Sequence, residues 1–127
     1  MLYLGLIEIL KALSHENRVR ILNLLQKRKL CVCELENLMK VNQSNASRHL
    51  IKLKQAGIIK SAQEAQWVFY SLNEKMLEEH PFLKNLIDKE LENLDLCIED
   101  NKRMKKYQNS NLNCEDLSCS SVDLDNL

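Results

Sequence analysis

Two cysteines separated by one residue, Cys31 and Cys33, are the side chains of this 127-residue sequence that most clearly suggest chemistry. Thiolates are soft donors that bind thiophilic ions, among them As(III), Sb(III), Cd(II) and Pb(II). Two cysteines among leucine and valine can equally be small buried hydrophobic residues. If they are ligands, their spacing matters, because residues i and i+2 of a helix point about 200° apart. One ion can therefore be held by both only where the helix is unwound or has not begun.

Three further cysteines lie toward the end of the chain. Cys97 falls beside a row of apolar residues, so we interpret it as a buried structural residue. Cys114 and Cys119 lie in a segment without apolar periodicity. There they are either exposed free thiols or ligands that fold over the first pair when an ion binds. We predict the second role, which makes the metal ligands Cys31, Cys33, Cys114 and Cys119.

A second group of polar side chains has the composition of a DNA-reading helix. Ala46, Leu50 and Leu53 fall at i, i+4 and i+7, so they define the buried face of a helix that stops at Gly57. The opposite face is polar and basic, with side chains that can donate to phosphates and to base edges in the major groove. His49 lies between the two faces, where packing is the more common role. The predicted DNA-binding residues are Gln43, Ser44, Asn45, Ser47, Arg48, His49 and Lys52.

Other elements must hold these two groups in place. Apolar residues at helical spacing predict helices over residues 2–13, 15–26 and about 33–39. β-Branched and aromatic residues in 58–61 and 67–72, joined by a polar connection, predict a hairpin. Four helices, a hairpin and a further helix are the elements of a winged helix-turn-helix, in which the fourth helix reads DNA.

Apolar residues continue at three- and four-residue intervals from Leu83 to Ile98 and predict one long helix after Pro81. A domain of this size cannot easily bury so long a stripe alone, so we expect a second copy of the chain to cover it. The acidic sequence beyond is rich in Asn and Ser, which predicts a tail that is disordered unless a ligand orders it. The expected fold is mostly α with a β-hairpin: a DNA-binding and dimerisation domain over 1–106 and a flexible, acidic, cysteine-containing tail over 107–127.

Composition and charge agree with a DNA-binding protein of one domain. A hydrophobic content of 45% allows a modest core. The net charge is zero, yet residues 1–60 hold eleven Lys and Arg against four acidic residues, and residues 61–127 hold seven against fourteen. The basic half is the candidate for binding a polyanion. Without a membrane span or a cleavage site after the apolar start, we expect a cytoplasmic protein, whose cysteines are thiols, metal ligands or redox switches rather than structural disulfides.

Four segments, in order, closely resemble the ArsR/SmtB family of arsenic repressors. They are residues 12–22 (ALSHENRVRIL), 30–35 (LCVCEL), 43–50 (QSNASRHL) and 67–70 (WVFY). The resemblance runs from about residue 2 to residue 98. It implies a dimeric winged-helix repressor that binds a palindromic operator and releases it on metal binding, with the first and last helices at the dimer interface. It also favours ligand use of the first cysteine pair over packing. One departure is the predicted wing tip, which has neither glycine nor a basic residue and so lacks the side chains that such a wing uses to contact the minor groove.

The sequence therefore predicts a metalloid-responsive repressor and not an enzyme. It binds double-stranded operator DNA as a homodimer, needs no cofactor to do so, and is released by As(III) or Sb(III). Alternatives are a Cd(II)- or Pb(II)-responsive repressor, a DNA-binding dimer that senses nothing, and a thiol redox sensor. In the redox sensor, Cys31 or Cys33 would pair with a distant cysteine, because a disulfide between the two would be strained. A thiol oxidoreductase is the weakest alternative, because the sequence lacks Cys-x-x-Cys and a convincing catalytic base.

Overall fold

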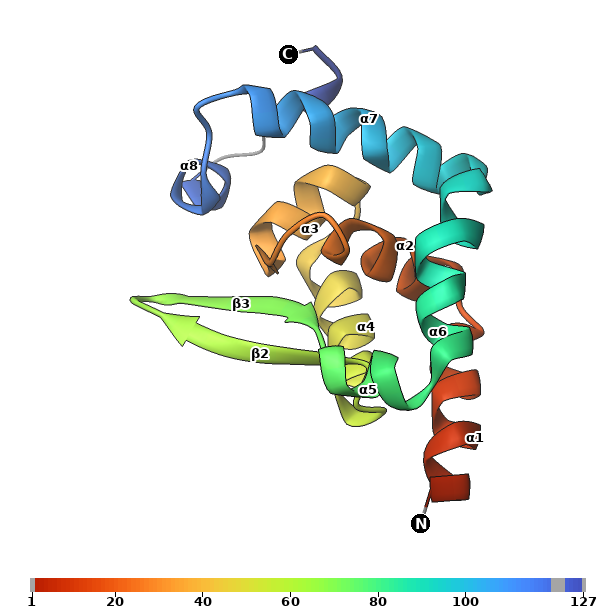
Figure 1. Ribbon diagram of the computed structural model, residues 1–127. Coiled ribbons are helices and arrows are strands. Elements are labelled where there is room, and N and C mark those ends of the chain that lie inside the picture. Colours follow the sequence, from red (N-terminus) through yellow and green to blue (C-terminus); the bar gives the residue numbers. More distant parts are fainter. Residues whose placement is uncertain (1, 120–122, 127) are drawn as a thin grey trace.

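The computed structural model describes residues 2–119 and 123–126, and four helices come first in the chain (Figure 1). These helices are α1 (Leu2–Leu13), α2 (Glu16–Leu25), α3 (Val32–Met39) and α4 (Gln43–Gln55). Their ranges agree with the four predicted helices. Helices α3 and α4 pack together across a short turn, and α2 packs against α4. This arrangement is a helix-turn-helix with α4 as its second helix.

Polar side chains fix where these helices begin and end. Asn42 caps α4, because its side-chain oxygen accepts a hydrogen bond from Asn45 N at 2.8 Å. At the start of α2, the cap is His15, whose Nδ1 accepts from Asn17 N at 3.1 Å. Ser14 donates its hydroxyl to Lys11 O at 2.6 Å and closes the end of α1.

The sheet has three antiparallel strands in the order β1-β3-β2. The predicted hairpin is present as β2 (Ile59–Glu64) and β3 (Trp67–Leu72), and it extends away from the helices as the wing (Figure 1). Its connection is shorter than expected, because the strands pair as far as Glu64 and Trp67 and leave a two-residue turn in which Ala65 has a φ of 58°. Strand β1 (Leu30–Cys31), which was not predicted, pairs with β3 and sets Cys31 opposite Phe69.

The prediction of one long helix after Pro81 is wrong, because the structure has several shorter helical elements there. The chain forms α5 (Glu74–Glu79), α6 (Pro81–Asn85), a π-helical turn η1 (Leu86–Glu90) and a 3-10 turn η2 (Leu91–Asn93). Leu94 is then extended, with a ψ of 133°, and α7 (Asp95–Asn109) starts in a new direction. The break allows α7 to cross α2 and α3 (Figure 1), where it buries Cys97, Met104 and Tyr107. Apolar spacing alone did not reveal the break, because the spacing continues through it.

The segment after α7 differs from the predicted disordered tail. It forms α8 (Cys114–Cys119), which packs against α3, and a 3-10 turn η3 (Leu124–Asn126), which packs against α7. Leu117 and Leu124 are buried and join the hydrophobic core. Two isolated apolar anchors are enough to dock a short segment, and they leave no periodic pattern in the sequence. The division of the chain at residue 106 stays a prediction, and α7 continues past it to Asn109.

A buried ionic cluster holds the end of α3 between α2 and α7. Arg20 donates to both Asp100 carboxylate oxygens at 2.8 Å, and Arg103 donates to one of them at 2.9 Å. The same guanidinium groups also donate to the last carbonyls of α3: Arg20 to Met39 O at 2.8 Å, and Arg103 to Leu38 O at 2.6 Å. Because these partners satisfy helix-end carbonyls and a buried charge together, the end of α3 is firmly fixed. Within the described residues, no helix is long and apolar enough to cross a membrane.

Candidate functional site

Cys31 lies where strand β1 ends and α3 begins. Its backbone is extended, with φ and ψ of −91° and 171°, and its N–H donates to Glu34 Oε1 at 2.8 Å. The side chain is buried. Because α3 starts at the next residue, Cys31 lies outside the helix that contains Cys33. The one-residue spacing required that the helix be unwound or not yet begun at one of the two cysteines, and Cys31 meets this requirement.

Cys114, the first residue of α8, lies directly against Cys31. The two residues are 83 positions apart in sequence, their Cα atoms are 6.7 Å apart, and their sulfur atoms form a disulfide. The sequence predicted thiols, metal ligands or redox switches rather than structural disulfides, and among these a disulfide fits only a redox switch. The disulfide follows from the docking of α8 on α3, which brings two buried sulfur atoms into bonding contact.

Glu34 is the third member of this group and was not predicted. One ligand atom from each of Cys31, Glu34 and Cys114 lies within 4.8 Å of the others. The Glu34 carboxylate is 1% exposed, accepts a hydrogen bond from the Tyr107 hydroxyl and lies 3.8 Å from Arg28 Nη2. Burial and the Glu34 carboxylate raise the pKa of Tyr107. The sequence signal for Glu34 was its place three residues after a helix cap, where a carboxylate commonly bonds the cap N–H.

The other predicted ligands lie differently. Cys33 is half-buried on α3 as a free thiol, outside the group of three. Burial, Glu36 and Glu34 raise its pKa, which disfavours its thiolate. Cys119 belongs to α8, and its side chain lies outside the part of the chain that the structure describes. Cys97 is buried in the core, as predicted, and burial raises its pKa to about 11.

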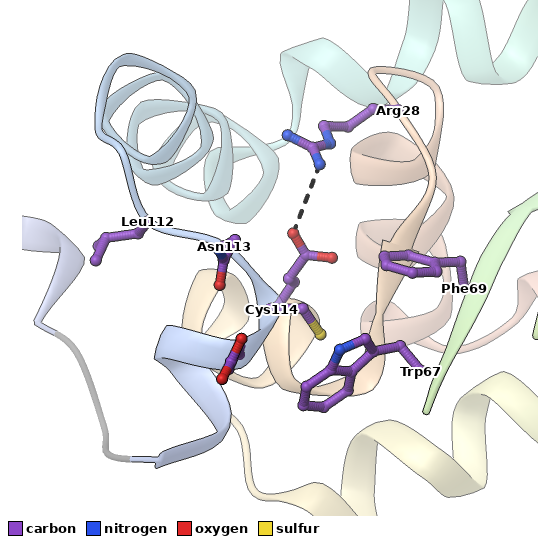
Figure 2. Close-up of a pocket in the computed structure, with 8 residues that line it drawn as sticks. Arg28, Trp67, Phe69, Leu112, Asn113 and Cys114 are labelled. Carbon is purple, nitrogen blue, oxygen red and sulfur yellow. Dashed lines mark ion pairs between the residues drawn. The ribbon is translucent and has the colours of Figure 1, made fainter. Parts of the chain in front are cut away.

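An open cavity of about 210 Å³ adjoins this group (Figure 2). Its walls come from the loop before β1, from α3, from the start of β3 and from the segment that leads into α8. In Figure 2, the sulfur atom of Cys114 lies beside the indole of Trp67, and a dashed line marks the ion pair of Arg28 with Glu34. Trp67 is the single tryptophan of the sequence. A ligand on the sulfur atoms would therefore lie near the one indole of the protein.

The second predicted site is the outer face of α4. Ala46, Leu50 and Leu53 are buried as predicted, so the opposite face of the helix is turned outward. Four of the predicted DNA-binding residues are exposed and two are half-buried. The exposed ones are Gln43, Ser44, Arg48 and Lys52, and the half-buried ones are Asn45 and Ser47.

His49 differs from its predicted place on the DNA-binding face. Its side chain is 1% exposed, and its Nδ1 accepts from Arg18 Nε at 3.2 Å. The His15 ring lies beside it, with ring centroids 4.2 Å apart, while His49 Nε2 is buried and has no hydrogen-bond partner among the described residues. Burial, followed by His15 and Arg18, lowers the pKa of His49 to about 4. His49 therefore joins α4 to α2 rather than facing outward.

Comparison with known proteins shows which family has a similar sequence. The family described as "Bacterial regulatory protein, arsR family" matches residues 15–61. The arsenic resistance transcriptional regulator ArsR1 of Pseudomonas putida is 34% identical over 82 residues, which are 63% of this chain and 64% of that protein. A cadmium resistance transcriptional regulatory protein CadC homolog of Staphylococcus aureus is 40% identical over 80 residues, 60% of this chain and 66% of that protein. These matches span just under two thirds of each relative's length.

Solved structures agree with the sequence comparison. The structure of reduced HlyU from Vibrio cholerae matches with a TM-score of 0.56 and 32% identity, over 65% of this chain and 87% of that chain. A helix-turn-helix followed by a β-hairpin defines the class of winged helix-turn-helix proteins. Within that class, the chain belongs to the arsR family of bacterial regulatory proteins.

Proposed function

We propose that this protein is a dimeric repressor that binds double-stranded operator DNA and is released when As(III) or Sb(III) bridges Cys31 and Cys114. The observation that carries the proposal is the pairing of these two buried cysteines at the start of α3, across 83 positions of sequence. Helix α3 packs on both α8 and α4. A ligand on the two sulfur atoms therefore contacts α3, and α3 in turn contacts α4, the helix with the proposed DNA-binding face.

DNA binding is supported by the outer face of α4 and by the charge of the basic half of the chain. Arg48 and Lys52 are exposed on that face, together with short hydrogen-bonding side chains. Two such helices related by two-fold symmetry fit successive major grooves, so we expect an operator with half-sites about one helical turn apart. The names of the relatives, regulators of arsenic and cadmium resistance, agree with this role.

Trivalent arsenic suits a pair of thiols. Arsenous acid, As(OH)₃, can exchange two hydroxides for two thiolates: each departing hydroxide takes a thiol proton and leaves as water. Two S–As bonds form, and the third position keeps a hydroxide. No electron is transferred, so the cysteines must be reduced beforehand. Cd(II) or Pb(II) would draw on the larger predicted set, in which Cys33 and Cys119 join Cys31 and Cys114.

Release follows from the position of Cys31. Its N–H is bonded to Glu34, which in turn binds α7 through Tyr107. A bridge between the two sulfur atoms, which the reduced pair lacks, changes how α8 and the first turn of α3 pack. Coupling of about 1–3 kcal/mol, typical of allosteric links, would weaken DNA binding about 5- to 150-fold.

The disulfide favours oxidative release as a second candidate function. A hydroperoxide would oxidise one thiol to a sulfenic acid, with the peroxide reduced to an alcohol or to water. The second thiol then displaces water to form the disulfide. This pairing joins Cys31 to a distant cysteine, as the sequence predicted for a redox sensor of this kind.

Dimerisation is supported by apolar side chains that the single chain leaves exposed. Ile7 and Leu10 on α1 are 50% and 48% exposed, and Leu94 and Ile98 at the start of α7 are 44% and 40% exposed. These elements follow one side of the molecule, together with α6 (Figure 1). A second copy would cover them, as the family resemblance implies.

The test measures DNA affinity and ligand binding separately. Fluorescence anisotropy of a duplex from the protein's own promoter reports DNA binding, first with reduced protein and then during titration with arsenite, antimonite, Cd(II) or hydrogen peroxide. The fluorescence of Trp67 reports binding at the cysteines without DNA, because its indole lies beside Cys114 (Figure 2). We expect arsenite to change the Trp67 signal and to weaken DNA binding at least fivefold.

Serine variants identify the ligands. Cys31→Ser and Cys114→Ser should bind DNA normally and lose the response to arsenite. Cys33→Ser distinguishes a site of Cys31 and Cys114 alone from the larger predicted set. If this variant still responds to arsenite, the Cys33 thiol is not a required ligand. Cys97→Ala, a change of a buried core cysteine, is the matched control. An unchanged arsenite response in Cys114→Ser would contradict the proposed site, and no DNA binding by the reduced protein would contradict the repressor.

A further inference from the structure

The C-terminal turn η3 brings a carboxylate to the turn of the helix-turn-helix. Leu124 is fully buried and anchors this turn. Beside it, the Asp125 carboxylate forms an ion pair with Lys40 and accepts from Arg103 Nη1 at 3.3 Å. The Asp125 backbone carbonyl accepts from Lys106 Nζ at 2.6 Å. These three cations, which we call the Lys40 surface, thus surround one anionic residue.

The Lys40 surface adjoins the start of the DNA-reading helix. Lys40 has a left-handed φ of 56° and ends α3, and α4 begins three residues later at Gln43. In helix-turn-helix proteins, the first residues of the second helix enter the major groove, and the backbone phosphates border that groove. A cation at this turn is therefore close to where phosphates pass.

Arg103 gives the surface a fixed component. Its side chain is 9% exposed, and its guanidinium is held by Leu38 O at 2.6 Å and by Asp100 at 2.9 Å. The remaining nitrogen, Nη1, points toward Asp125. Beside it, Lys102 and Lys105 line an open groove of about 440 Å³ along α7, where Lys102 forms an ion pair with Glu99 at 3.3 Å and Lys105 adds a further cation. A buried guanidinium that presents one donor outward, between lysines, is an anion site that loses little side-chain entropy on binding.

We propose that the Lys40 surface contacts a backbone phosphate of operator DNA and that the Asp125 carboxylate occupies it when the protein is off DNA. Phosphate and carboxylate oxygens are both anionic acceptors that lysine and arginine bind with charge-assisted hydrogen bonds. The inference rests on the proposed DNA-binding function. Because only one anion can take these donors at a time, docking of Asp125 and binding of DNA compete.

The cysteine pair controls this competition. Cys114 precedes Asp125 in the chain, and its bond to Cys31 holds α8 on α3. A closed cysteine pair therefore keeps Asp125 at a high effective concentration near the Lys40 surface. An open pair allows α8 to leave α3 and the carboxylate to leave with it, which frees the surface for phosphate.

The test compares conservative charge variants of the full chain. Asp125→Asn removes the competing charge, and Lys40→Gln removes one cation. Asp123→Asn is the matched control, because it makes the same charge change in the same exposed segment and keeps the oxygen that accepts from Asp125 N. Anisotropy with the promoter duplex measures Kd at KCl concentrations between 50 and 200 mM, once with the cysteine pair oxidised and once with it reduced, and circular dichroism verifies folding. An unrelated duplex of equal length reports non-specific binding.

With the cysteine pair oxidised, we expect Asp125→Asn to bind the promoter duplex roughly three- to tenfold more tightly than the native chain, with Asp123→Asn close to native. In reduced protein, where the carboxylate has left the surface, all three chains should bind alike. Lys40→Gln should lower the slope of log Kd against log salt by about 1, on both duplexes. Two results together would overturn this inference alone: an unchanged Kd in Asp125→Asn with the cysteine pair oxidised, and an unchanged salt slope in Lys40→Gln. This holds provided that the reduced native chain binds the promoter duplex and Arg48→Ala does not. Failure of the native chain to bind DNA would overturn the proposed function as well.

Discussion

The imidazole of His49 makes folding sensitive to acid. The unfolded chain binds a proton at His49 near the ordinary pKa of 6.5, whereas the folded chain does so only near pH 4. The unfolded state therefore takes up this proton first as the pH falls. The contribution of His49 to stability is complete above pH 6.5 and declines between pH 6.5 and 4.

We expect His49→Gln, which keeps a polar side chain of similar length, to weaken this acid dependence. The native chain should lose about 2 kcal/mol more than the variant between pH 7.5 and pH 4.5, as measured by urea unfolding at both values. His80→Gln, at a half-buried histidine outside the His49 environment, is the control and should follow the native chain. Equal losses in the native chain and in His49→Gln would contradict the buried, neutral imidazole.

The residues of the candidate site were predictable to different degrees. Cys31 followed from its residue type and from the family resemblance, and the outer face of α4 followed from helical spacing. His49 could not be placed with certainty, because its position on the helix lies between the faces and the contact with Arg18 on α2 decides which side it takes. Glu34 was missed because a carboxylate at the start of a helix is common and gives no sign of a sulfur neighbour.

Among the elements, the wing contains a strained turn. Ala65 has a φ of 58°, a left-handed conformation that alanine rarely adopts and glycine adopts readily. We expect Ala65→Gly to stabilise the protein by about 0.5 kcal/mol, because the relief of strain exceeds the added freedom of the unfolded chain. Thermal unfolding followed by circular dichroism measures the change.

Ala62→Gly is the control for this prediction. Ala62 lies within β2, paired with Phe69, where glycine only weakens a strand. The two variants should therefore shift the unfolding temperature in opposite directions. A lower unfolding temperature in both would show that the turn is not strained in the way that its backbone angle indicates.

Helices with regular apolar spacing were predicted well, and the elements that depend on distant partners were not. Strand β1 is two residues long and exists only because β3 lies beside it. The break at Leu94 occurs where local spacing still favours a helix, and burial of Cys97, Met104 and Tyr107 against other helices outweighs that local preference. Local sequence describes what a segment prefers alone, and these two features depend on tertiary packing.

At the scale of the whole molecule, the exposed apolar side predicts self-association. Leu10→Glu and Ile98→Glu each place a charge on this side, so we expect the native chain to sediment as a dimer and both variants as monomers at the same concentration. Val68→Glu on the wing, at a residue that is 41% exposed, is the matched control and should remain dimeric. A dimer that persists in both variants would place the interface elsewhere.

The assembly of the candidate cysteine site was the part of the whole molecule that the sequence revealed least. Cys114 was predicted as a ligand, but nothing local indicated that α8 would dock on α3 through Leu117. The partner of Cys31 is set by contacts between the two ends of the chain. Such contacts leave no pattern in one sequence, because each segment satisfies them with only one or two residues.

The distance in sequence between Cys31 and Cys114 also has a consequence for the order of events during synthesis. At about 5–20 residues per second, the 83 positions between the two cysteines take about 4 to 17 seconds to translate. The helix-turn-helix and the wing leave the ribosome during that interval, before Cys114 is made. A newly made chain therefore acquires its helix-turn-helix and wing seconds before it acquires the second cysteine of the proposed inducer site.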